Sequence, residues 1–203
     1  MPFKKLHPHI QDKLESLEIT IPTPFQRISI PVIKSGANVF CTAKKDSGKT
    51  TTLILTILQK LKCEEVGNGP RALVIVENKE KALELYDAFL KYTRYTSLRV
   101  YLGDEKIHID LQKSEIFEGI DILISTPKTM NKLFLFNAVS TSQVTIFSID
   151  DAEFLVQKTP YSNLMSITQS ISKCQFVLYS EKMHPILKRF KSHFMEHSKI
   201  VSV

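Results

Sequence analysis

Cysteine is scarce in this chain, and its three cysteines, Cys41, Cys63 and Cys174, lie far apart. Their spacing matches no paired metal-ligand motif, and their odd number is unlike the disulfide framework of a small secreted domain. We therefore expect an intracellular protein, cytoplasmic or nuclear, rather than a secreted one. The six histidines are also scattered, so solvated or structural roles are expected for them.

Long hydrophobic runs are missing as well. No stretch approaches the roughly 18 consecutive apolar residues that a membrane-spanning helix needs, and residues 1–8 contain no apolar signal core. We therefore expect no membrane partner. The sequence has no internal repeat, low-complexity tract or long linker, so its 203 residues favour a single domain over 1–203.

The composition that remains is that of an ordinary globular protein, with 43% hydrophobic and 24% charged residues. The formal net charge is +6. An excess of positive charge favours an anionic partner, such as a nucleotide or a nucleic acid, but a solvated basic surface explains it equally well.

The segment AKKDSGKT, residues 43–50, is the most informative in the chain. It lies between a short apolar run and a helix-periodic run, which is the setting of a phosphate-binding P-loop. Amide groups of Ser47 and Gly48 are expected to point at phosphate oxygens. Lys49 would add positive charge at the β- and γ-phosphates, and Thr50 a hydroxyl for Mg²⁺.

Lys45 and Asp46 stand where such a loop normally has small residues and glycine. Glycine there lets the backbone approach phosphate and adopt a positive φ. A carboxylate a few ångströms from a phosphate costs on the order of 1 kcal/mol in water, and several when partly desolvated. Lys45 offsets this either by pairing with Asp46 or by meeting phosphate itself, and the sequence leaves both possibilities open.

Apolar, β-rich runs alternate with helix-periodic segments along the whole chain. Most runs are continuous, as expected of strands that are covered on both faces. The pattern predicts an α/β fold: a doubly wound, mostly parallel sheet of about seven strands with helices on both faces. The predicted strands are 39–42, 72–76, 98–102, 120–125, 144–149, 175–179 and 200–203, and the predicted helices are 10–17, 51–61, 79–92, 128–136, 164–171 and 185–194.

Two acids, Asp150 and Asp151, follow the fifth predicted strand. In P-loop NTPases a strand-end Asp holds Mg²⁺ and a neighbouring acid orients the attacking water. By itself such a pair is better explained by an ordinary loop or a helix N-terminus, which Asp caps well. Together with the upstream Gly-Lys-Thr it favours Asp150 as the metal ligand and Asp151 as the residue that orients water.

Seven segments, in order, resemble motifs of the first RecA-like domain of DEAD-box RNA helicases. With Phe3 as the upstream aromatic residue, the resemblance in order and approximate spacing extends from Phe3 to Val203. The region 1–34 resembles the Q-motif region and 35–203 the P-loop core, with no second RecA-like domain. The matching segments are IPTPFQ at 21–26, the P-loop, VENKEKA at 76–82, Gly103-Asp104, Thr126-Pro127-Lys128-Thr129, Asp150-Asp151-Ala152-Glu153 and Ser180-Glu181-Lys182.

This resemblance implies ATP and Mg²⁺ as cofactors, sequence-independent RNA binding, and ATP hydrolysis coupled to RNA binding or unwinding. It also implies protein partners and a second RecA-like domain, in cis or in trans. It assigns catalysis to Lys49, Asp150 and Asp151, metal binding to Thr50 and Asp150, and interdomain coupling to Glu153 and Ser180. The nucleotide contacts that it implies are Phe3, Phe25, Gln26, Lys45, Asp46, Ser47, Gly48, Lys49, Thr50 and Thr51. The RNA contacts that it implies are Asn78, Lys79, Gly103, Thr126, Pro127 and Lys128.

Several of these positions depart from the family pattern. Asp151 is one methylene shorter than the family's Glu, and a misplacement of about 1 Å can cost roughly a hundredfold in rate. Lys79 replaces an arginine and loses its bidentate fork, while Asp104 puts negative charge where phosphate would pass. We therefore expect this chain alone to hydrolyse ATP poorly and not to unwind RNA. Two alternatives are a pseudo-helicase acting as an RNA-binding or protein-interaction module, and a different P-loop enzyme such as a nucleotide kinase.

Overall fold

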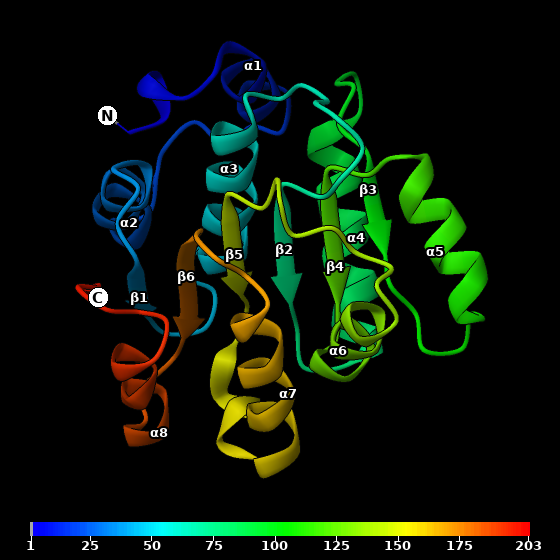
Figure 1. The fold of residues 1–203 in the computed structure, drawn as a ribbon. Coiled ribbons are helices and arrows are strands. Elements are labelled where there is room, and N and C mark those ends of the chain that lie inside the picture. Colours follow the sequence, from blue (N-terminus) through cyan, green and yellow to red (C-terminus); the bar gives the residue numbers. More distant parts are fainter. Residues whose placement is uncertain (1) are drawn as a thin grey trace.

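Seven parallel strands form one sheet in a computed structural model that describes residues 2–203 (Figure 1). Their order across the sheet is β3-β4-β2-β5-β6-β1-β7, and every neighbouring pair is parallel. The prediction of a doubly wound sheet is confirmed. The strands are β1 (Val39–Thr42), β2 (Ala72–Ile75), β3 (Val100–Leu102), β4 (Ile122–Ser125), β5 (Ile146–Ile149), β6 (Gln175–Ser180) and β7 (Lys199–Ser202).

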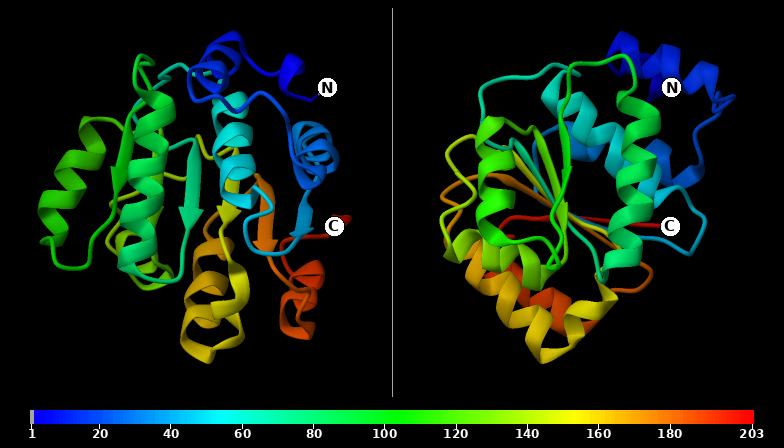
Figure 2. Two further views of the ribbon diagram at one scale, coloured as in Figure 1. Left: turned by 180° about the vertical axis from the view of Figure 1, so that it is seen from behind. Right: turned by 90° about the vertical axis from the view of Figure 1, so that its right-hand side faces the viewer.

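Helices cover both faces of this sheet, as the edge-on view in Figure 2 shows. The α-helices are α1 (Pro8–Ser16), α2 (Pro24–Lys34), α3 (Lys49–Leu61), α4 (Lys79–Thr93), α5 (Ile109–Glu118), α6 (Pro127–Leu135), α7 (Lys158–Gln169) and α8 (Pro185–Lys188). Short 3₁₀ turns are η1 (Phe3–Lys5), η2 (Ala152–Val156) and η3 (Arg189–Ser192).

Alternate residues of the central strands enter one of two hydrophobic cores, because successive side chains of a strand point to opposite faces. Cys41 and Val74 pack in the core beneath α1 to α4, while Phe40 and Leu73 pack in the core beneath α5 to α8. All four residues are fully buried. Burial on both faces explains why the strands read as continuous apolar runs rather than as alternating ones.

Polar side chains cap the first turns of five α-helices, and three of these caps are Thr23, Asn78 and Thr126. Thr23 accepts a hydrogen bond from the backbone N–H of Gln26 and forms a capping box at the start of α2. Asn78 caps α4 and Thr126 caps α6 in the same way. Such caps satisfy backbone N–H groups that have no partner within the helix.

The structure corrects the predicted helices in several places. Helix α2 was not predicted, since Pro31 lies inside it and proline normally ends or kinks a helix. Helix α5 was missed because its hydrophobic residues do not mark its buried face: Leu111 and Phe117 are exposed, whereas Gln112 is buried. Helix α7 begins at 158 rather than 164, and the segment 185–194 divides into α8 and η3.

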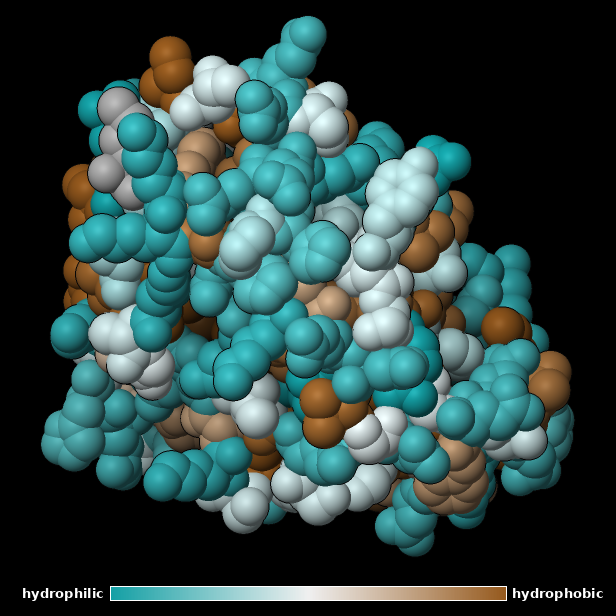
Figure 3. Space-filling model, turned by 90° about the horizontal axis from the view of Figure 1, so that it is seen from above, coloured by the Kyte–Doolittle hydropathy of each residue, from teal (hydrophilic) through white to brown (hydrophobic). Residues whose placement is uncertain are grey.

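The strand order divides the carboxyl edge of the sheet into two halves. Strands β1, β6 and β5 lie side by side in one half, and β2, β4 and β3 lie side by side in the other. Ligands of doubly wound sheets bind beyond this edge. Figure 3 shows the opposite side of the molecule, which is largely hydrophilic with scattered apolar side chains.

No helix within residues 2–203 is long and apolar enough to cross a membrane. No group of three or more His, Cys, Asp or Glu side chains in the same range is arranged to hold a metal ion. All three cysteines are free, and burial raises the pKa of the Cys63 thiol to about 11, with a smaller contribution from Glu64.

A buried carboxylate, Asp121, joins three segments before β4. It forms ion pairs with Arg71 at 2.8 Å and Arg99 at 2.9 Å, and accepts hydrogen bonds from the backbone N–H groups of Val66 and Arg99. Burial by itself would raise the pKa of Asp121, but the hydrogen bonds from Arg99, Arg71 and Val66 outweigh it and hold that pKa below its usual value.

Asp121→Ala is expected to lower the free energy of unfolding at pH 7 by about 3 kcal/mol, because it leaves two arginines without their buried partner. Urea denaturation measures this difference. A lowered folded-state pKa gives stability that is present above the unfolded pKa of about 4 and is lost as the pH falls through the folded value. The variant and the wild-type chain should therefore converge in stability in strong acid.

The control for this prediction is Asp87→Ala, at an exposed position of α4. Its expected effect stays within about 0.5 kcal/mol. An equal loss in both variants would contradict the role given to Asp121.

Candidate functional site

The P-loop follows β1 and turns directly into α3. Asp46 and Gly48 both have left-handed backbone geometry, with φ of 60° and 90°. Asp is one of the few side chains that tolerate this region, so the loop keeps its turn without the expected glycine at 46. The buried Lys49 ammonium donates to the carbonyl oxygens of Ala43 at 2.8 Å and Lys44 at 3.1 Å. Lys49 is thus held across the loop by backbone oxygens that a phosphate would replace.

Lys45 and Asp46 are both exposed at the tip of the loop. No ion pair joins them in the part of the chain that the structure describes. The pairing considered from sequence is therefore not formed, and contact of Lys45 with phosphate stays a prediction. Ser47 is half-buried below them, and Thr51 is half-buried in the first turn of α3.

The capping box of α2 is tied to the P-loop by two hydrogen bonds. The Thr23 hydroxyl donates to the carbonyl of Ser47 at 2.7 Å, and Nε2 of Gln26 donates to the carbonyl of Gly48 at 3.4 Å. Oε1 of Gln26 accepts from the backbone N–H of Thr23 at 2.9 Å. The structure therefore places Gln26 beside the P-loop, and its contact with the nucleotide stays a prediction. Thr23, which lies in the motif but had no predicted role, also contacts the loop.

The two predicted aromatic contacts of the nucleotide lie in the core. Phe3 is 7% exposed and Phe25 is 1% exposed, and both pack in the cluster beneath α1 to α4. Both rings therefore have a structural role in the core. Contact of either ring with the nucleotide stays a prediction.

Asp150 ends β5 and faces the first turn of α3. The Thr50 hydroxyl donates to Asp150 Oδ2 at 3.4 Å, so the two predicted metal ligands are together. Burial, followed by the charge of Asp151, raises the pKa of Asp150 to about 6; Thr50 and Lys49 lower it by less. Its Oδ1 atom is buried and accepts no hydrogen bond from any described residue.

Asp151 adopts left-handed geometry, with φ of 43°, and is half exposed. Its Oδ2 lies 3.7 Å from the ammonium of Lys81, which also pairs with Glu77 at 2.9 Å. Sequence reasoning missed Lys81, because only the adjacency of β2 and β5 brings the start of α4 to the acid pair. Together with Thr50, Val76, Glu84 and Leu85, these acids and Lys81 line a hollow of about 140 Å³.

The third acid of this segment reaches the neighbouring strand end. Glu153 accepts a hydrogen bond from the backbone N–H of Glu181, just after β6. The Ser180 hydroxyl is buried and has no hydrogen-bond partner among residues 2–203. The two predicted coupling segments thus meet, but through a backbone N–H of Glu181 rather than through the serine.

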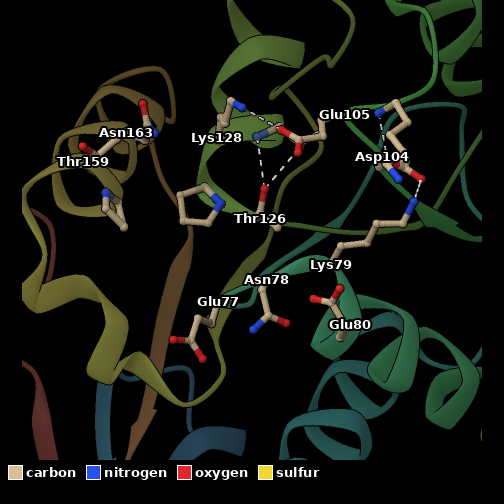
Figure 4. A pocket seen from close by; sticks show the side chains of 15 residues that line it. Glu77, Asn78, Lys79, Glu80, Asp104, Glu105, Thr126, Lys128, Thr159 and Asn163 are labelled. Carbon is tan, nitrogen blue, oxygen red and sulfur yellow. Dashed lines mark hydrogen bonds and ion pairs between the residues drawn. The ribbon is translucent and has the colours of Figure 1, made fainter.

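A groove of about 490 Å³ lies beyond β2, β4 and β3 (Figure 4). Every residue predicted to contact RNA lines it, so the structure brings all six together. Asn78 and Thr126 use their side chains to cap α4 and α6, and Lys79 and Lys128 stand one and two residues beyond the caps. The lining also includes Thr159, Pro160 and Asn163 of α7, which no sequence motif indicated.

The nucleotide half has the groups that ATP and Mg²⁺ need. Hydroxyl and carboxylate oxygens are the ligands that Mg²⁺ prefers, and Thr50 and Asp150 supply them side by side. Two further buried oxygens nearby, the hydroxyls of Ser47 and Ser180, have no hydrogen-bond partner in the described chain. Buried polar atoms normally find a partner, so this donor set fits a bound phosphate and metal ion.

A model of the DEAD/DEAH box helicase family matches residues 23–183. The chain belongs to this family. It corresponds to the N-terminal RecA-like domain of DEAD-box RNA helicases. Among curated relatives, the probable ATP-dependent RNA helicase ddx42 of Dictyostelium discoideum is 27% identical over 85% of this chain and 18% of its own length. The mouse ATP-dependent RNA helicase DDX54 is 29% identical over 84% of this chain and 20% of its own length.

Solved DEAD-box structures share the fold. A DEAD box protein from the hyperthermophile Methanococcus jannaschii superposes with a TM-score of 0.89 at 18% identity, over 98% of this chain and 54% of that one. A Saccharomyces cerevisiae Dbp5 variant bound to Nup159, Gle1 and ADP gives 0.85 at 16% identity, over 98% and 52%. The chain therefore spans about a fifth of the curated DEAD-box relatives and about half of these solved chains.

Gly48→Ala tests the junction between the DEAD-box Q motif and the P-loop. An added Cβ would lie 2.6 Å from Nε2 of Gln26, at a φ of +90°. The left-handed backbone alone costs about 1–2 kcal/mol for an L side chain, and displacement of Gln26 adds to it. In a Gln26→Ala background, chemical denaturation should show a smaller loss. Equal losses in both backgrounds would show that the glutamine does not crowd this site.

Asp150→Asn is expected to stabilise the chain in the absence of metal. A folded-state pKa near 6 exceeds the ordinary value of about 4, so ionisation costs the folded state on the order of 2 kcal/mol above pH 6. That cost shrinks as the pH falls from 6 to 4 and vanishes below. The Asn variant should therefore melt at a higher temperature at pH 7, with no difference at pH 3.5. A lower melting temperature at pH 7 would contradict the pKa argument.

Proposed function

We propose that this domain binds ATP with Mg²⁺ and grips an RNA backbone, as one half of an ATP-dependent RNA helicase that a second RecA-like domain completes. The observation that supports it best is the meeting of Lys49, Thr50 and Asp150 at the carboxyl edge. Lys49 and Thr50 come from the P-loop and Asp150 from the acid pair after β5, and the loop geometry serves phosphate binding. The groove beside this site provides a path for the RNA backbone.

In this proposal each residue has a limited task. Lys49 leaves the carbonyls of Ala43 and Lys44 and neutralises phosphate charge. Thr50 and Asp150 would hold Mg²⁺, and the ion would supply positive charge to the phosphates when bound. Asp151 accepts a hydrogen bond from the attacking water, and Lys81 keeps the Asp151 carboxylate oriented.

The nucleotide base is assigned to the Q motif. Both ends of the Gln26 side-chain amide already form hydrogen bonds, one with the Thr23 N–H and one with the Gly48 carbonyl. Recognition of adenine requires the 3.4 Å bond to Gly48 to open, and this is the weaker of the two. Binding of the base would thereby change a hydrogen bond of the P-loop directly, through Gln26.

A second RecA-like domain is part of the proposal, because this chain spans about half of the solved DEAD-box chains that it matches. The contact of Glu153 with the segment after β6 lies at the carboxyl edge of the sheet, where the second RecA-like domain would dock. We also propose that the complete helicase binds protein partners.

One rival is a pseudo-helicase that binds RNA or protein without turnover. It is favoured by the exposed carboxylate of Asp46 in the P-loop. It is also favoured by the ion pair with Lys81, which occupies the Asp151 carboxylate that would otherwise orient water. Nucleotide binding separates the two, since a protein-interaction module has no need of Lys49 or Gln26.

The test is titration of the chain with a fluorescent ATP analogue and Mg²⁺, beside Lys49→Ala and Gln26→Ala. We expect saturable binding, weakened at least tenfold by Lys49→Ala because a charge-assisted contact of about 1.5–3 kcal/mol is lost. Gln26→Ala should instead remove the preference for ATP over GTP. The matched control is Lys60→Ala, an exposed lysine at the far end of α3, which should bind as the wild-type chain does.

Absence of binding at millimolar nucleotide would overturn the ATP-binding half of the proposal. It would leave the pseudo-helicase as the better account.

A further inference from the structure

The groove carries more negative than positive charge, although the chain as a whole has a net charge of +6. Its charged lining consists of the three lysines Lys79, Lys106 and Lys128 and the four acids Glu77, Glu80, Asp104 and Glu105. Affinity for nucleic acid comes mainly from lysines and arginines that neutralise phosphates. A groove of this composition is therefore expected to bind RNA weakly unless some of its negative charge is removed or displaced.

Two of the lysines are already neutralised by one loop. Between β3 and α5, Asp104 forms an ion pair with Lys79 on the α4 side, and Glu105 forms one at 2.8 Å with Lys128 on the α6 side (Figure 4). The Lys79 and Lys128 side chains are those that the family resemblance assigns to RNA. The loop thus reaches both lysines at once.

Asp104 is held in place through both its backbone and its carboxylate. Gln112 is 2% exposed, and its amide donates to the Asp104 carbonyl at 2.8 Å and accepts from the Asp104 N–H at 3.1 Å. Oδ1 of Asp104 also accepts from the backbone N–H of Lys106 at 3.0 Å. Bonds to Lys79 and Lys106 hold the pKa of Asp104 below its ordinary value. A charge held this firmly competes with phosphate at little entropic cost.

We infer that Asp104 and Glu105 are built-in counter-anions that occupy the RNA-binding lysines and set the affinity of the groove. Their carboxylates hold Lys79 and Lys128 where phosphates would, so a strand must displace both ion pairs to bind. This inference rests on the proposed RNA contact and adds its regulation. Any change that removes the two ion pairs raises the affinity of the groove for RNA.

The test uses the whole 203-residue chain and a fluorescein-labelled oligouridylate, without nucleotide, in fluorescence anisotropy. Asp104→Asn with Glu105→Gln should tighten binding by about three- to tenfold, from the range of exposed ion-pair energies. Two freed lysines should also steepen the slope of log K against log salt concentration, by about 0.7 for each lysine on single strands. Adding Lys79→Ala and Lys128→Ala to the double variant should abolish both gains.

The matched control is Glu80→Gln, which removes a negative charge from the same groove. Glu80 forms no ion pair within the described residues. Its expected effect is below twofold and leaves the salt slope unchanged. An equal gain from Glu80→Gln would overturn the inference, since it would show a general effect of charge.

Two other results would also overturn it. One is a double variant that binds RNA no better than the wild-type chain. The other is a wild-type groove that binds a lysine- and arginine-rich peptide and loses it in the double variant, because the acids would then serve a cationic partner. Binding of the fluorescent ATP analogue, measured on the same samples, tells these failures apart from failure of the nucleotide site.

Discussion

Parallel pairing of all seven strands is the constraint on which the rest of this domain depends. It brings every carboxyl end to one edge, so the loops that follow β1, β5 and β6 meet in one half and those that follow β2, β3 and β4 meet in the other. Lys81 links the two halves through its ion pair with Asp151. Without this common direction, the P-loop and the acid pair, about a hundred residues apart in sequence, would not share a site.

The nucleotide half is arranged at the expense of stability. Asp150 is buried beside a second acid with an unpartnered oxygen, which is unfavourable in a folded protein that holds no metal. Asp46 of the P-loop also has a positive φ, which is strained for a residue with a side chain. Such strain persists where the surroundings determine it, and here Thr23 and Gln26 bind the loop from the side. A site of this kind is stable only because the α2 cap and the sheet support it.

The sequence predicted the strands well and the long-range contacts poorly. The runs that became β1 and β2 were placed within one residue, because strands buried on both faces are continuous apolar runs. The groove residues converged because their strand ends share an edge. Neither the Lys81–Asp151 contact nor the Lys128–Glu105 pair was predictable, since each depends on which strands are neighbours. Asp104 was recognised as an unusual charge, but its contact with Gln112 requires α5, in which Leu111 and Phe117 face solvent while Gln112 is buried.

In the proposed function, Lys49 moves from the backbone carbonyls of the P-loop to the phosphates when ATP binds. A crystal structure of the chain grown with Mg²⁺ and a non-hydrolysable ATP analogue tests it most directly. The account predicts that Nζ of Lys49 leaves the carbonyls of Ala43 and Lys44 for the phosphates, with the metal ion between Thr50 and Asp150. A structure in which Lys49 keeps both carbonyl bonds, with the nucleotide absent or bound elsewhere, would contradict the account.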